Sequence, residues 1–546
     1  MPYPWRGSRM LILMGNVQTL VKRFLGTGTT SDASALEADI ASSAENQVSN
    51  AFSSSTYQYF SWIGQHAPCF PICGDQVQVL TEPTQFFEVL KVKARKAKRR
   101  ITLASLYLGT GPLEKELVSS IHEACKNAAI MKNSDFEVNI LLDVTRGSRG
   151  KINSRTMLQG LIKEFPHLVS VSLYHTPDLR GLLRKIVPER FNETIGLTHL
   201  KVYLVDNSLI ISGANLSENY FTNRQDRYIL FSDCKRMADF FHELVKAVAS
   251  FSFSLQPDDT LKLHKMCSVH PYKGDDMKFK LAARDRISDV LQRHMQTQQK
   301  LWQGNGDMKS PTNGSAGPHL PQVSGVQNGG NIADKNDTWV YPLVQMGPIG
   351  VLHDEQVTLQ LLRESSKDDE ILLASGYFNL TDHYMEVILQ ESLARYRLLM
   401  ASPEVNGFYG AKGIAGYVPS AYVYIARQFF QEVQAYKQAQ RIQLFEYFRD
   451  KWTFHVKGLW YYLPEQTMPS LTLIGSPNFG YRSVYRDLEC QVAMVTDNQN
   501  LQKQLKEEHV RLYQPSVLVT EERFRRADRH VPYWVTLVTG FIKHFF

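Results

Sequence analysis

The sequence predicts an α/β protein in which one fold occurs twice, as two similar lobes with one active site between them. Three observations lead to this prediction. From about residue 75 onward, short β-branched runs alternate with helical patterns. A stretch rich in Gly, Pro, Ser and Asn, residues 304–337, interrupts the globular sequence. Strand-like segments then recur in the same order on both sides of that stretch.

The recurring segments form matched pairs. RITLASLYLGTG begins at Arg100 and EILLASGYFNLT begins at Glu370; each is an apolar strand with an aromatic residue (Tyr107 or Tyr377) two positions after its serine. VNILLDVTRGSRG corresponds in the same way to YRLLMASPEVNGFYG, and VSLYHTP to IQLFEYF. The common order indicates an internal duplication.

Composition sets the boundaries outside the repeats. Residues 1–31 carry four basic residues, a run of apolar ones and no acid, which is typical of a mitochondrial transit peptide; a disordered basic tail is the alternative. Residues 32–74 are expected to form a flexible joint because Ser, Thr, Ala and Asn are frequent there. The lobes are expected over 75–300 and 338–529, with a disordered linker over 301–337.

The overall charge does not identify a class of binding partner. The chain has 546 residues and a formal charge of +7, of which +4 lies in the first 31 residues, so the remainder is only mildly basic. No run of apolar residues is long enough for a membrane-spanning helix. Six scattered cysteines provide neither a disulfide framework nor a zinc-ligand set, so no metal site is expected.

A polar motif follows the third repeated segment in the first half. The string THLKVYLVDNSLIISGANLSENYFTNRQDRYILF contains His199, Lys201 and Asp206 in the pattern H-x-K-x4-D, followed by Gly213 and Asn215. One H-x-K is weak evidence, because three residues at such spacing arise easily by chance.

The second half contains a matching motif. FHVKGLWYYLPEQTMPSLTLIGSPNFGYRSVYRDLECQV supplies His455 and Lys457, and then Gly475, Ser476 and Asn478. An acidic residue follows eleven positions after each asparagine: Asp226 in the first half and Glu489 in the second. Two copies with matched spacing indicate a functional site.

The motif residues suit chemistry on a phosphate diester. Residues i and i+2 of a strand point to the same face, so each histidine projects beside its lysine. One imidazole can attack phosphorus and form a phosphohistidine, while the other protonates the departing oxygen and later deprotonates the acceptor. Lysines and asparagines stabilise the developing charge, and carboxylates orient the imidazoles. This scheme requires no metal and no cofactor.

The motifs resemble those of the phospholipase D superfamily, over roughly residues 75–300 and 338–515. The resemblance implies two lobes with mixed sheets flanked by helices. It also implies that Glu489 orients His199 and Asp226 orients His455, with His199 as nucleophile and His455 as general acid/base. Within the superfamily the strings are similar to those of phosphatidyltransferases, which implies transfer from CDP-diacylglycerol to glycerol 3-phosphate with release of CMP, on the route to phosphatidylglycerol and cardiolipin.

The second motif departs from the superfamily pattern. Tyr462 stands where the pattern has an acid, five positions after Lys457. Asp206, its counterpart, is therefore interpreted either as a catalytic residue or as the cap of a turn before Asn207.

Two further segments carry weaker hypotheses. Gly109 and Gly111 in ASLYLGTG suggest nucleotide binding only faintly, because the lysine of a phosphate-binding loop is missing; a turn after a strand is the alternative. Basic residues crowd positions 91–100, either as a solvated helix end or as a contact for anionic lipid.

The C-terminal segment, residues 530–546, has no acid and spaces its apolar residues as an amphipathic helix does. It is expected either to lie in a membrane interface or to dock on the protein core. The first reading would make the protein peripheral on the inner mitochondrial membrane, in contact with anionic lipid.

The sequence leaves other functions open. Phosphatidylserine-forming and cardiolipin-forming transferases and a hydrolytic phospholipase D share the chemistry. A nuclease of the same superfamily is less favoured and no nucleic-acid partner is expected, because the basic run at 91–100 contains no aromatic residue for stacking on bases. An inactive lipid-binding scaffold is the third class, and oligomeric state is left open.

Overall fold

The computed structural model describes residues 56–303 and 336–545. The predicted transit peptide, most of the predicted joint and most of the predicted linker lie outside the described residues. The chain from Thr56 onward forms one contact-connected unit, so both lobes can be described together.

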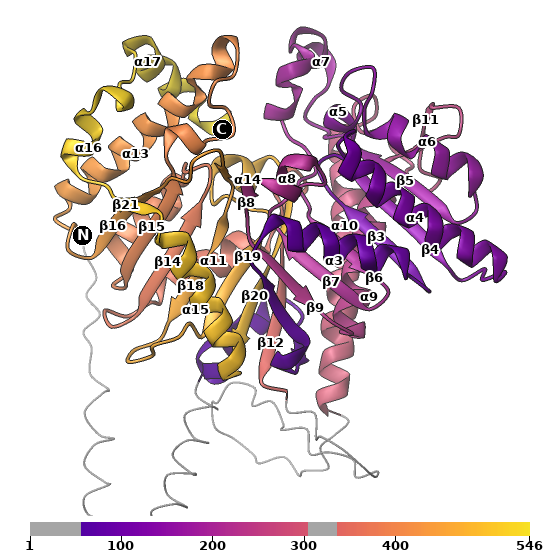
Figure 1. Ribbon diagram of the computed structural model, residues 1–546, viewed down its shortest axis with the longest axis horizontal. Helices are drawn as coiled ribbons and strands as arrows, with labels where there is room; N and C mark the ends of the chain where they lie inside the picture. The colour runs from indigo at the N-terminus through magenta and orange to yellow at the C-terminus, as the bar shows by residue number, and fades with distance from the viewer. Residues whose placement is uncertain (1–55, 304–335, 546) are drawn as a thin grey trace, which may run out of the picture. The chain divides into compact units, whose positions relative to one another are not determined.

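The first lobe occupies one half of this unit (Figure 1). Its strands are β2 (Val77–Leu80), β3 (Arg100–Ala104), β4 (Glu137–Asp143), β5 (Val169–Tyr174), β6 (Val202–Val205), β7 (Ser208–Ser212), β8 (Arg224–Gln225), β9 (Tyr228–Phe231), β10 (Phe253–Leu255) and β11 (Leu261–Leu263). Its helices are η2 (Gly74–Gln76), α3 (Pro83–Arg95), α4 (Pro112–Ile130), α5 (Val144–Gly147), α6 (Ser154–Glu164), α7 (Gly181–Ile186), η3 (Glu189–Thr194), α8 (Glu218–Thr222), α9 (Lys235–Ala249) and α10 (Asp276–Gln303).

The second lobe occupies the other half. Its strands are β12 (Thr338–Met346), β13 (Val351–Leu352), β14 (Glu370–Ser375), β15 (Arg395–Ala401), β16 (Ile442–Tyr447), β17 (Thr453–Phe454), β18 (Lys457–Tyr462), β19 (Leu471–Gly475), β20 (Leu488–Thr496) and β21 (Ser516–Leu518). Its helices are η4 (Gly347–Ile349), α11 (His353–Arg363), α12 (Asp382–Glu386), η5 (Val387–Glu391), η6 (Pro403–Val405), η7 (Gly413–Tyr417), α13 (Val418–Ala435), α14 (Tyr481–Tyr485), α15 (Gln499–Tyr513), α16 (Glu521–Arg525), η8 (Ala527–Arg529), α17 (Tyr533–Ile542) and η9 (Lys543–Phe545).

The two sheets repeat one strand order, which confirms the predicted duplication. The first sheet contains β5-β4-β3-β6-β7-β9-β2, and the second contains β16-β15-β14-β18-β19-β20-β12. In each, the first three strands are parallel and the following ones are antiparallel. The matched sequence strings are β3 and β14, β4 and β15, and β5 and β16. The predicted α/β fold with mixed sheets is therefore confirmed.

The described part of the expected joint is folded. After η1 (Ser61–Gln65), strand β1 (Phe70–Ile72) pairs with β12 of the second lobe. Phe60 and Ile63 are fully buried in the core of that lobe. The prediction of a flexible joint, made from the Ser-rich composition, is therefore wrong for these residues. Burial of the aromatic and aliphatic side chains after residue 56 stabilises the folded segment. At the expected linker, α10 continues to its last described residue, Gln303.

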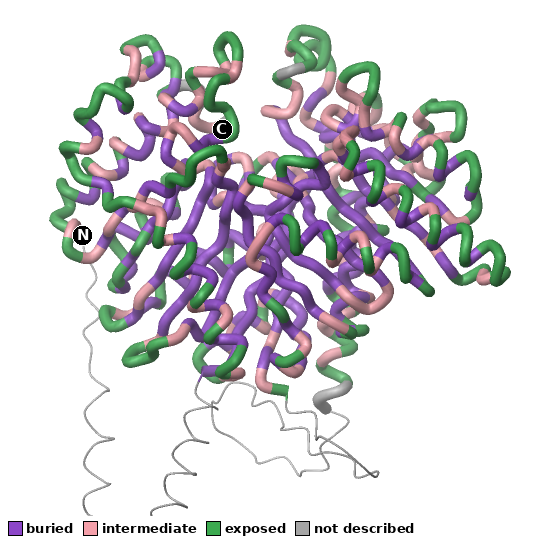
Figure 2. Tube along the Cα trace, viewed as in Figure 1, coloured by how far each residue is buried: buried purple, intermediate pink, exposed green. Residues whose placement is uncertain are grey.

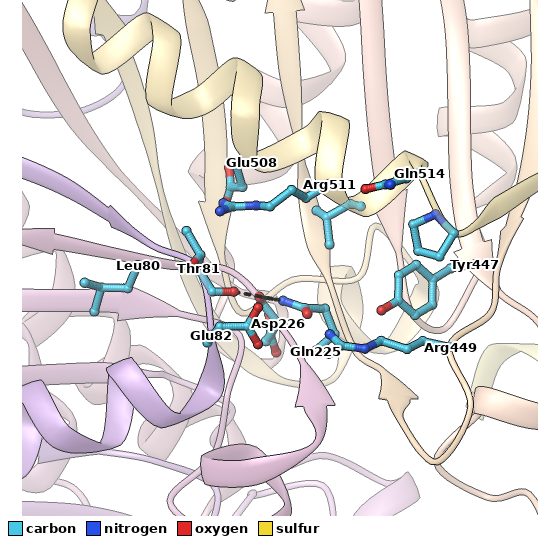
Figure 3. A pocket seen from close by; sticks show the side chains of 12 residues that line it. Leu80, Thr81, Glu82, Gln225, Asp226, Tyr447, Arg449, Glu508, Arg511 and Gln514 are labelled. Atoms are coloured by element: carbon cyan, nitrogen blue, oxygen red, sulfur yellow. Dashed lines mark hydrogen bonds between the residues drawn. The ribbon is translucent and has the colours of Figure 1, made fainter.

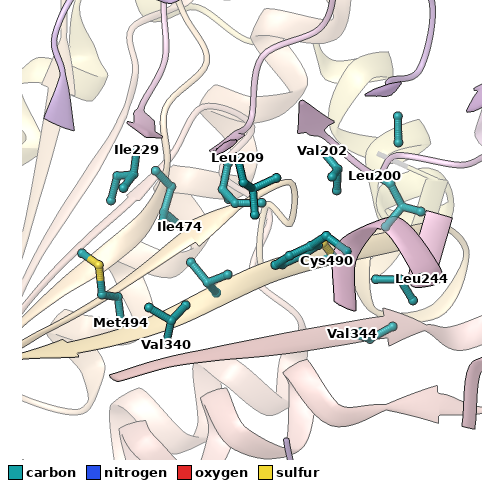
Figure 4. Packing of buried hydrophobic residues seen from close by; sticks show 14 of the residues in the cluster. Leu200, Val202, Leu209, Ile229, Leu244, Val340, Val344, Ile474, Cys490 and Met494 are labelled. Atoms are coloured by element: carbon teal, nitrogen blue, oxygen red, sulfur yellow. The ribbon is translucent and has the colours of Figure 1, made fainter. Parts of the chain in front are cut away.

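Apolar residues pack on both faces of each sheet, and for this reason the central strands β3, β6 and β18 are buried throughout (Figure 2). Helices α3, α4 and α6 cover the outer face of the first sheet, and α11 and α13 cover that of the second. Between the sheets, side chains such as Leu209 and Ile229 meet Ile474 and Met494 in one cluster (Figure 4). This shared core joins the lobes.

The C-terminal helix α17 divides its residues between the protein and the solvent. Val535 and Thr539 are buried, whereas 78% of Tyr533 and 52% of Leu537 are exposed. Docking and exposure therefore occur on opposite faces of the same helix. In the described part of the chain, no helix combines the length and apolarity needed to cross a membrane.

Candidate active site

The first motif's histidine is held by the opposite lobe. Thr198 forms a parallel β-bridge with Leu488, and the His199 N–H donates to the Leu488 carbonyl over 2.7 Å. The Leu488 N–H in turn donates to the Leu197 carbonyl over 2.9 Å. The backbone of the second lobe thus fixes where the first imidazole stands, just before β6.

The second histidine is held in the reciprocal way. Strand β17 pairs with β8 of the first lobe, and the His455 N–H donates to the Gln225 carbonyl over 2.9 Å. The end of β14 approaches closely here, because a Cβ on Gly376 would lie 2.9 Å from the His455 Cα. Glycine is required at that position to leave room for the histidine backbone.

Each imidazole contacts a carboxylate from the other lobe. His199 Nδ1 lies 2.9 Å from Glu489 Oε2, and His455 Nδ1 lies 2.7 Å from Asp226 Oδ2. These are the pairings that the superfamily resemblance implies. Both carboxylates are buried, and Gly213 makes room for one of them, since a Cβ there would lie 2.8 Å from Asp226.

Burial controls the protonation of this cluster. It lowers the pKa of His199 and His455 well below the ordinary value, and the neighbouring lysines lower it further. Burial also raises the pKa of Glu489, and that of Asp226 to about 6. At neutral pH the rings are therefore uncharged, each carboxylate accepts the Nδ1–H, and the lone pair remains on Nε2.

Each lysine lies beside the histidine two residues before it, although the expected strand begins only at Val202 in the first motif and at Lys457 in the second. Lys201 and Lys457 each donate to the carbonyl of their own histidine over 2.8 Å. Burial lowers the pKa of Lys457 to about 8 and that of Lys201 well below its ordinary value. A phosphate beside them would favour their charged form, so a bound anionic substrate and the ammonium groups stabilise each other.

The first asparagine reaches the opposite histidine through a tyrosine. Asn215 Nδ2 donates to the Tyr220 hydroxyl over 3.1 Å, and that hydroxyl lies 3.2 Å from His455 Nε2. Ser105 donates to Asn215 Oδ1 over 3.4 Å, which fixes the amide. Tyr220 was missed in the sequence, although it lies within the motif string.

The second asparagine is arranged differently. The Asn478 N–H donates to the Ser483 hydroxyl over 3.0 Å, and the Ser375 hydroxyl donates to the Asn478 carbonyl over 3.0 Å. The buried Asn478 Oδ1 has no hydrogen-bond partner within the described residues. Ser476 lies beside β20, where its hydroxyl accepts from the Cys490 N–H over 3.1 Å.

Arg224, Tyr220 and Tyr377 lie close to His455, and the sequence analysis did not identify them as site residues. The Arg224 guanidinium carbon lies 4.6 Å from the centre of the Tyr220 ring, and Arg224 Nε donates to Thr453 Oγ1 over 2.9 Å. The Tyr377 ring lies 5.6 Å from the imidazole of His455. The aromatic residue repeated after Leu-Ala-Ser was the available signal, and it was used only to recognise the duplication.

Two more carboxylates fix the segment before His199. Asp487 Oδ1 accepts from the Leu197 N–H over 3.1 Å, and Asp143 Oδ2 accepts from the Thr198 N–H over 3.2 Å. Burial raises the pKa of each of these acids to about 7. Arg482 lies 3.0 Å from Asp487 and compensates its charge.

Asp206 has a structural position. It follows β6, so the four residues of that strand separate it from Lys201, and its φ of 54° places it in the left-handed turn before β7. Its carboxylate accepts backbone N–H groups of residues 98–100. Its counterpart Tyr462 contacts His509 instead. These contacts match the turn-capping interpretation of Asp206.

The glycines of the weak nucleotide hypothesis lie against a carboxylate. Gly109 donates its N–H to the Leu216 carbonyl over 2.8 Å. A Cβ on Gly111 would lie 2.7 Å from Glu114 Oε2, and Glu114 is buried. This negative charge opposes phosphate binding, and the geometry favours the turn interpretation.

A cavity of about 480 Å³ lies between the lobes beside Asp226 (Figure 3). Asp226 and Gln225 line it from the first lobe, and Arg449 and Arg511 line it from the second. No group of three or more histidine, cysteine or acidic residues suited to a metal ion occurs in residues 56–303 and 336–545.

No family model matches the sequence. Among solved structures, a phosphatidylserine synthase of Haemophilus influenzae has a similar fold, with a TM-score of 0.64, 17% identity, and coverage of 90% of this chain and 100% of that one.

Curated sequences are much more similar. The mitochondrial CDP-diacylglycerol–glycerol-3-phosphate 3-phosphatidyltransferase of Gallus gallus is 52% identical over 488 residues, 89% of this chain and 86% of that protein. The protein of the same name from Homo sapiens is 51% identical over 492 residues, with the same coverage. The CDP-diacylglycerol–glycerol-3-phosphate 3-phosphatidyltransferase of Schizosaccharomyces pombe, whose name does not include the word mitochondrial, is 34% identical over 463 residues, 81% of this chain and 89% of that protein. With these identities over most of its length, this chain belongs to the CDP-diacylglycerol–glycerol-3-phosphate 3-phosphatidyltransferase family.

Proposed function

We propose that this chain transfers a phosphatidyl group from CDP-diacylglycerol to glycerol 3-phosphate, forming phosphatidylglycerophosphate and releasing CMP. The observation that carries the proposal is the crosswise site itself. Two imidazoles, each oriented by a carboxylate of the opposite lobe, stand beside two buried lysines. Family relatives at about half identity carry this activity in their names.

In the first step, His199 Nε2 attacks the phosphorus that carries the diacylglycerol. A phosphorus–nitrogen bond forms, the bond to the CMP oxygen breaks, and CMP leaves with the electron pair. Lys201 and Lys457 neutralise the charge on the non-bridging oxygens. Among the described residues the His199 ring has hydrogen bonds only at Nδ1, and its side chain is 12% exposed against 4% for His455. Its Nε2 is therefore the more accessible nucleophile.

In the second step, a hydroxyl of glycerol 3-phosphate attacks the phosphohistidine. The new phosphorus–oxygen bond replaces the bond to His199, and the hydroxyl proton passes to His455 Nε2. The lowered pKa of His455 keeps this ring neutral and ready to accept the proton. Asp226, at Nδ1, stabilises the imidazolium that results.

Arg224 supplies a second phosphate site on the acceptor side. In-line displacement requires the leaving group and the acceptor to occupy the side opposite the nucleophile, which here is the His455 side. Arg224 stands on that side against Tyr220. Its guanidinium suits the phosphate of CMP in the first step and that of glycerol 3-phosphate in the second.

The protein is proposed to act in mitochondria, as a peripheral protein of the inner membrane. The relatives from chicken and human are named as mitochondrial proteins. Residues 1–31 have the composition of a transit peptide. A fluorescent fusion lacking these residues is expected to lose its mitochondrial location, and unchanged import would contradict the assignment.

Acceptor-dependent release of CMP tests the overall reaction. Purified protein with CDP-diacylglycerol in mixed micelles is expected to release CMP only when glycerol 3-phosphate is added. Serine and phosphatidylglycerol should not replace it. Release with water alone would indicate a hydrolase, and release with serine would indicate a phosphatidylserine-forming enzyme.

Trapping the intermediate tests the two histidine roles. With donor labelled in the phosphatidyl group, His455→Ala should accumulate label on the protein while turnover falls by roughly 10³-fold or more. His199→Ala should accumulate none and lose turnover entirely. Label found on His455 of the wild-type protein would reverse the assignment.

A further inference from the structure

Large apolar side chains are exposed at the same end of both lobes. In the first lobe, α7 exposes 71% of Leu182 and 63% of Ile186. In the second, α17 exposes Tyr533 and Leu537, and η7 exposes 71% of Ile414. Figures 1 and 2 show α7 and α17 as the outermost helices at one end of the molecule, on either side of α8 and α14. We refer to α7, η7 and α17 together as the rim.

Both parts of the rim connect directly to the catalytic segments. After α17, the His544 carbonyl accepts from Arg486 Nε over 3.2 Å, and Arg486 lies three residues before Glu489. After α7 and η3, Gly196 packs so closely on Arg486 that a Cβ would lie 2.5 Å from its carbonyl oxygen. The chain then reaches His199 three residues later. The two parts of the rim therefore flank the end of the molecule at which the imidazoles lie (Figure 1).

The second-lobe part of the rim is a packed surface. The rings of Tyr417 and Trp534 meet edge to face with centroids 4.7 Å apart, which ties η7 to α17. Val535 is buried beneath them. The exposed side chains thus project from helices that the protein core already holds in place, so exposure does not result from a detached tail.

The charge of the rim is one-sided. Residues 180–188, 406–431 and 530–546 contain no aspartate or glutamate. Lys185 and Lys412 are exposed within the first two of these segments. Exposed aliphatic and aromatic side chains combined with cations and no acids match the interface of a bilayer with anionic headgroups.

We propose that the rim docks on the surface of an anionic bilayer and presents the two histidines to it. Apolar side chains of both lobes enter the interface, the lysines contact lipid phosphates, and the headgroup of a donor lipid reaches the site while its acyl chains stay in the membrane. The choice of a lipid substrate rests on the proposed function. The docking itself rests on exposure and charge.

Paired charge substitutions test the docking surface. The variants are Leu182→Glu with Ile186→Glu, and Tyr533→Glu with Leu537→Glu. Their matched control is Ile130→Glu with Met131→Glu, at the far end of α4, where 70% and 78% of the side chains are exposed. All are first compared with wild type by circular dichroism and thermal unfolding, so that loss of folding is recognised.

Binding is measured by co-sedimentation with phosphatidylcholine vesicles, with and without phosphatidylglycerol, and without CDP-diacylglycerol. Each rim variant should bind anionic vesicles at least tenfold more weakly than wild type, and the control should bind normally. Because no substrate is present, this result is independent of whether the protein proves to be the proposed transferase.

Activity provides the second measurement. Rim variants should release CMP slowly from donor embedded in vesicles and at the wild-type rate from a short-chain, monomeric donor. Normal vesicle binding by both folded rim variants would overturn the proposal. A second outcome would also overturn it: the wild type forms a dimer in size-exclusion chromatography, the rim variants do not, and their vesicle binding is unchanged. That outcome would assign the rim to contact with a second copy of the chain.

Discussion

The two lobes can be compared position by position between each asparagine and the acid eleven residues later. Five residues after the asparagine, the first lobe has Tyr220 and the second has Ser483. The Tyr220 hydroxyl reaches His455 Nε2, the reacting nitrogen, whereas Ser483 donates to the carboxylate of Glu489 over 2.8 Å. One imidazole thus has a hydroxyl at its reacting atom and the other does not.

A second difference occurs nine residues after the asparagine, where Arg224 of the first lobe corresponds to Asp487 of the second. Each contacts the residue two before the opposite histidine: Arg224 contacts Thr453 and Asp487 contacts Leu197. The positions are equivalent and the charges are opposite. The duplication has kept a histidine, a lysine and a carboxylate in each half and changed their neighbours, so the two sides of a nearly symmetric site differ in the groups around each imidazole.

Of the substitutions that test this comparison, neutralising the orienting carboxylates should have the largest effect on activity. Asp226→Asn and Glu489→Gln remove the charge that holds each Nδ1–H, and either change should lower kcat by roughly 10²- to 10⁴-fold. The measurement is steady-state CMP release. Asp206→Asn is the matched control and should retain wild-type kcat, since its carboxylate contacts backbone N–H groups. An equal loss in the control would contradict the assignment.

The pH profile sharpens the same prediction. Asp226 must be ionised to orient His455, and its pKa is raised to about 6, so kcat/KM should fall as the pH drops below that value. Lys457 must be charged, and its pKa is lowered to about 8, so kcat/KM should also fall as the pH rises above that value. The acid limb should be absent from the residual activity of Asp226→Asn. A limb that persists unchanged would assign it to another group.

Substitution of Arg224, which differs in charge from its counterpart Asp487, should have an intermediate effect on activity. Arg224→Met removes the guanidinium from the acceptor side, and the KM for glycerol 3-phosphate should rise by roughly 10- to 100-fold. CMP should also inhibit less strongly in competition with glycerol 3-phosphate. Arg224→Lys is expected to restore part of the affinity, because charge returns without the planar fork. An unchanged KM would remove Arg224 from the acceptor site.

Substitution of the unmatched motif residues should have the smallest effect on catalysis. Asp206→Ala leaves three backbone N–H groups without their acceptor and places alanine at a φ of 54°, so the free energy of unfolding should fall by about 1–3 kcal/mol. Tyr462→Phe loses one hydrogen bond to His509 and should cost about 1 kcal/mol. Urea unfolding measures both. A loss of kcat in folded protein would instead make Asp206 part of the reaction.

The sequence by itself determined the repeat, the mixed α/β fold and the identity of the central residues. These properties depend on local spacing: each lysine follows its histidine by two positions, which places Lys201 beside His199 and Lys457 beside His455 in the segments that lead into β6 and β18. The matched distance of eleven residues between each asparagine and the following acid then identified Asp226 and Glu489 as members of a common site. The aromatic residues before β1 were missed because average composition hides a few residues with large buried area.

Only the tertiary structure decided which groups meet. His199 and Glu489 are 290 residues apart, and His455 and Asp226 are 229 apart, so no local pattern encodes their contacts. The structure likewise assigned Asp206 to a turn, brought Arg224 to the His455 side and divided α17 into a buried and an exposed face. The physical reason is common to all of these: hydrogen bonds, desolvation and exposure depend on what packs against a residue, and here that partner usually comes from the other lobe.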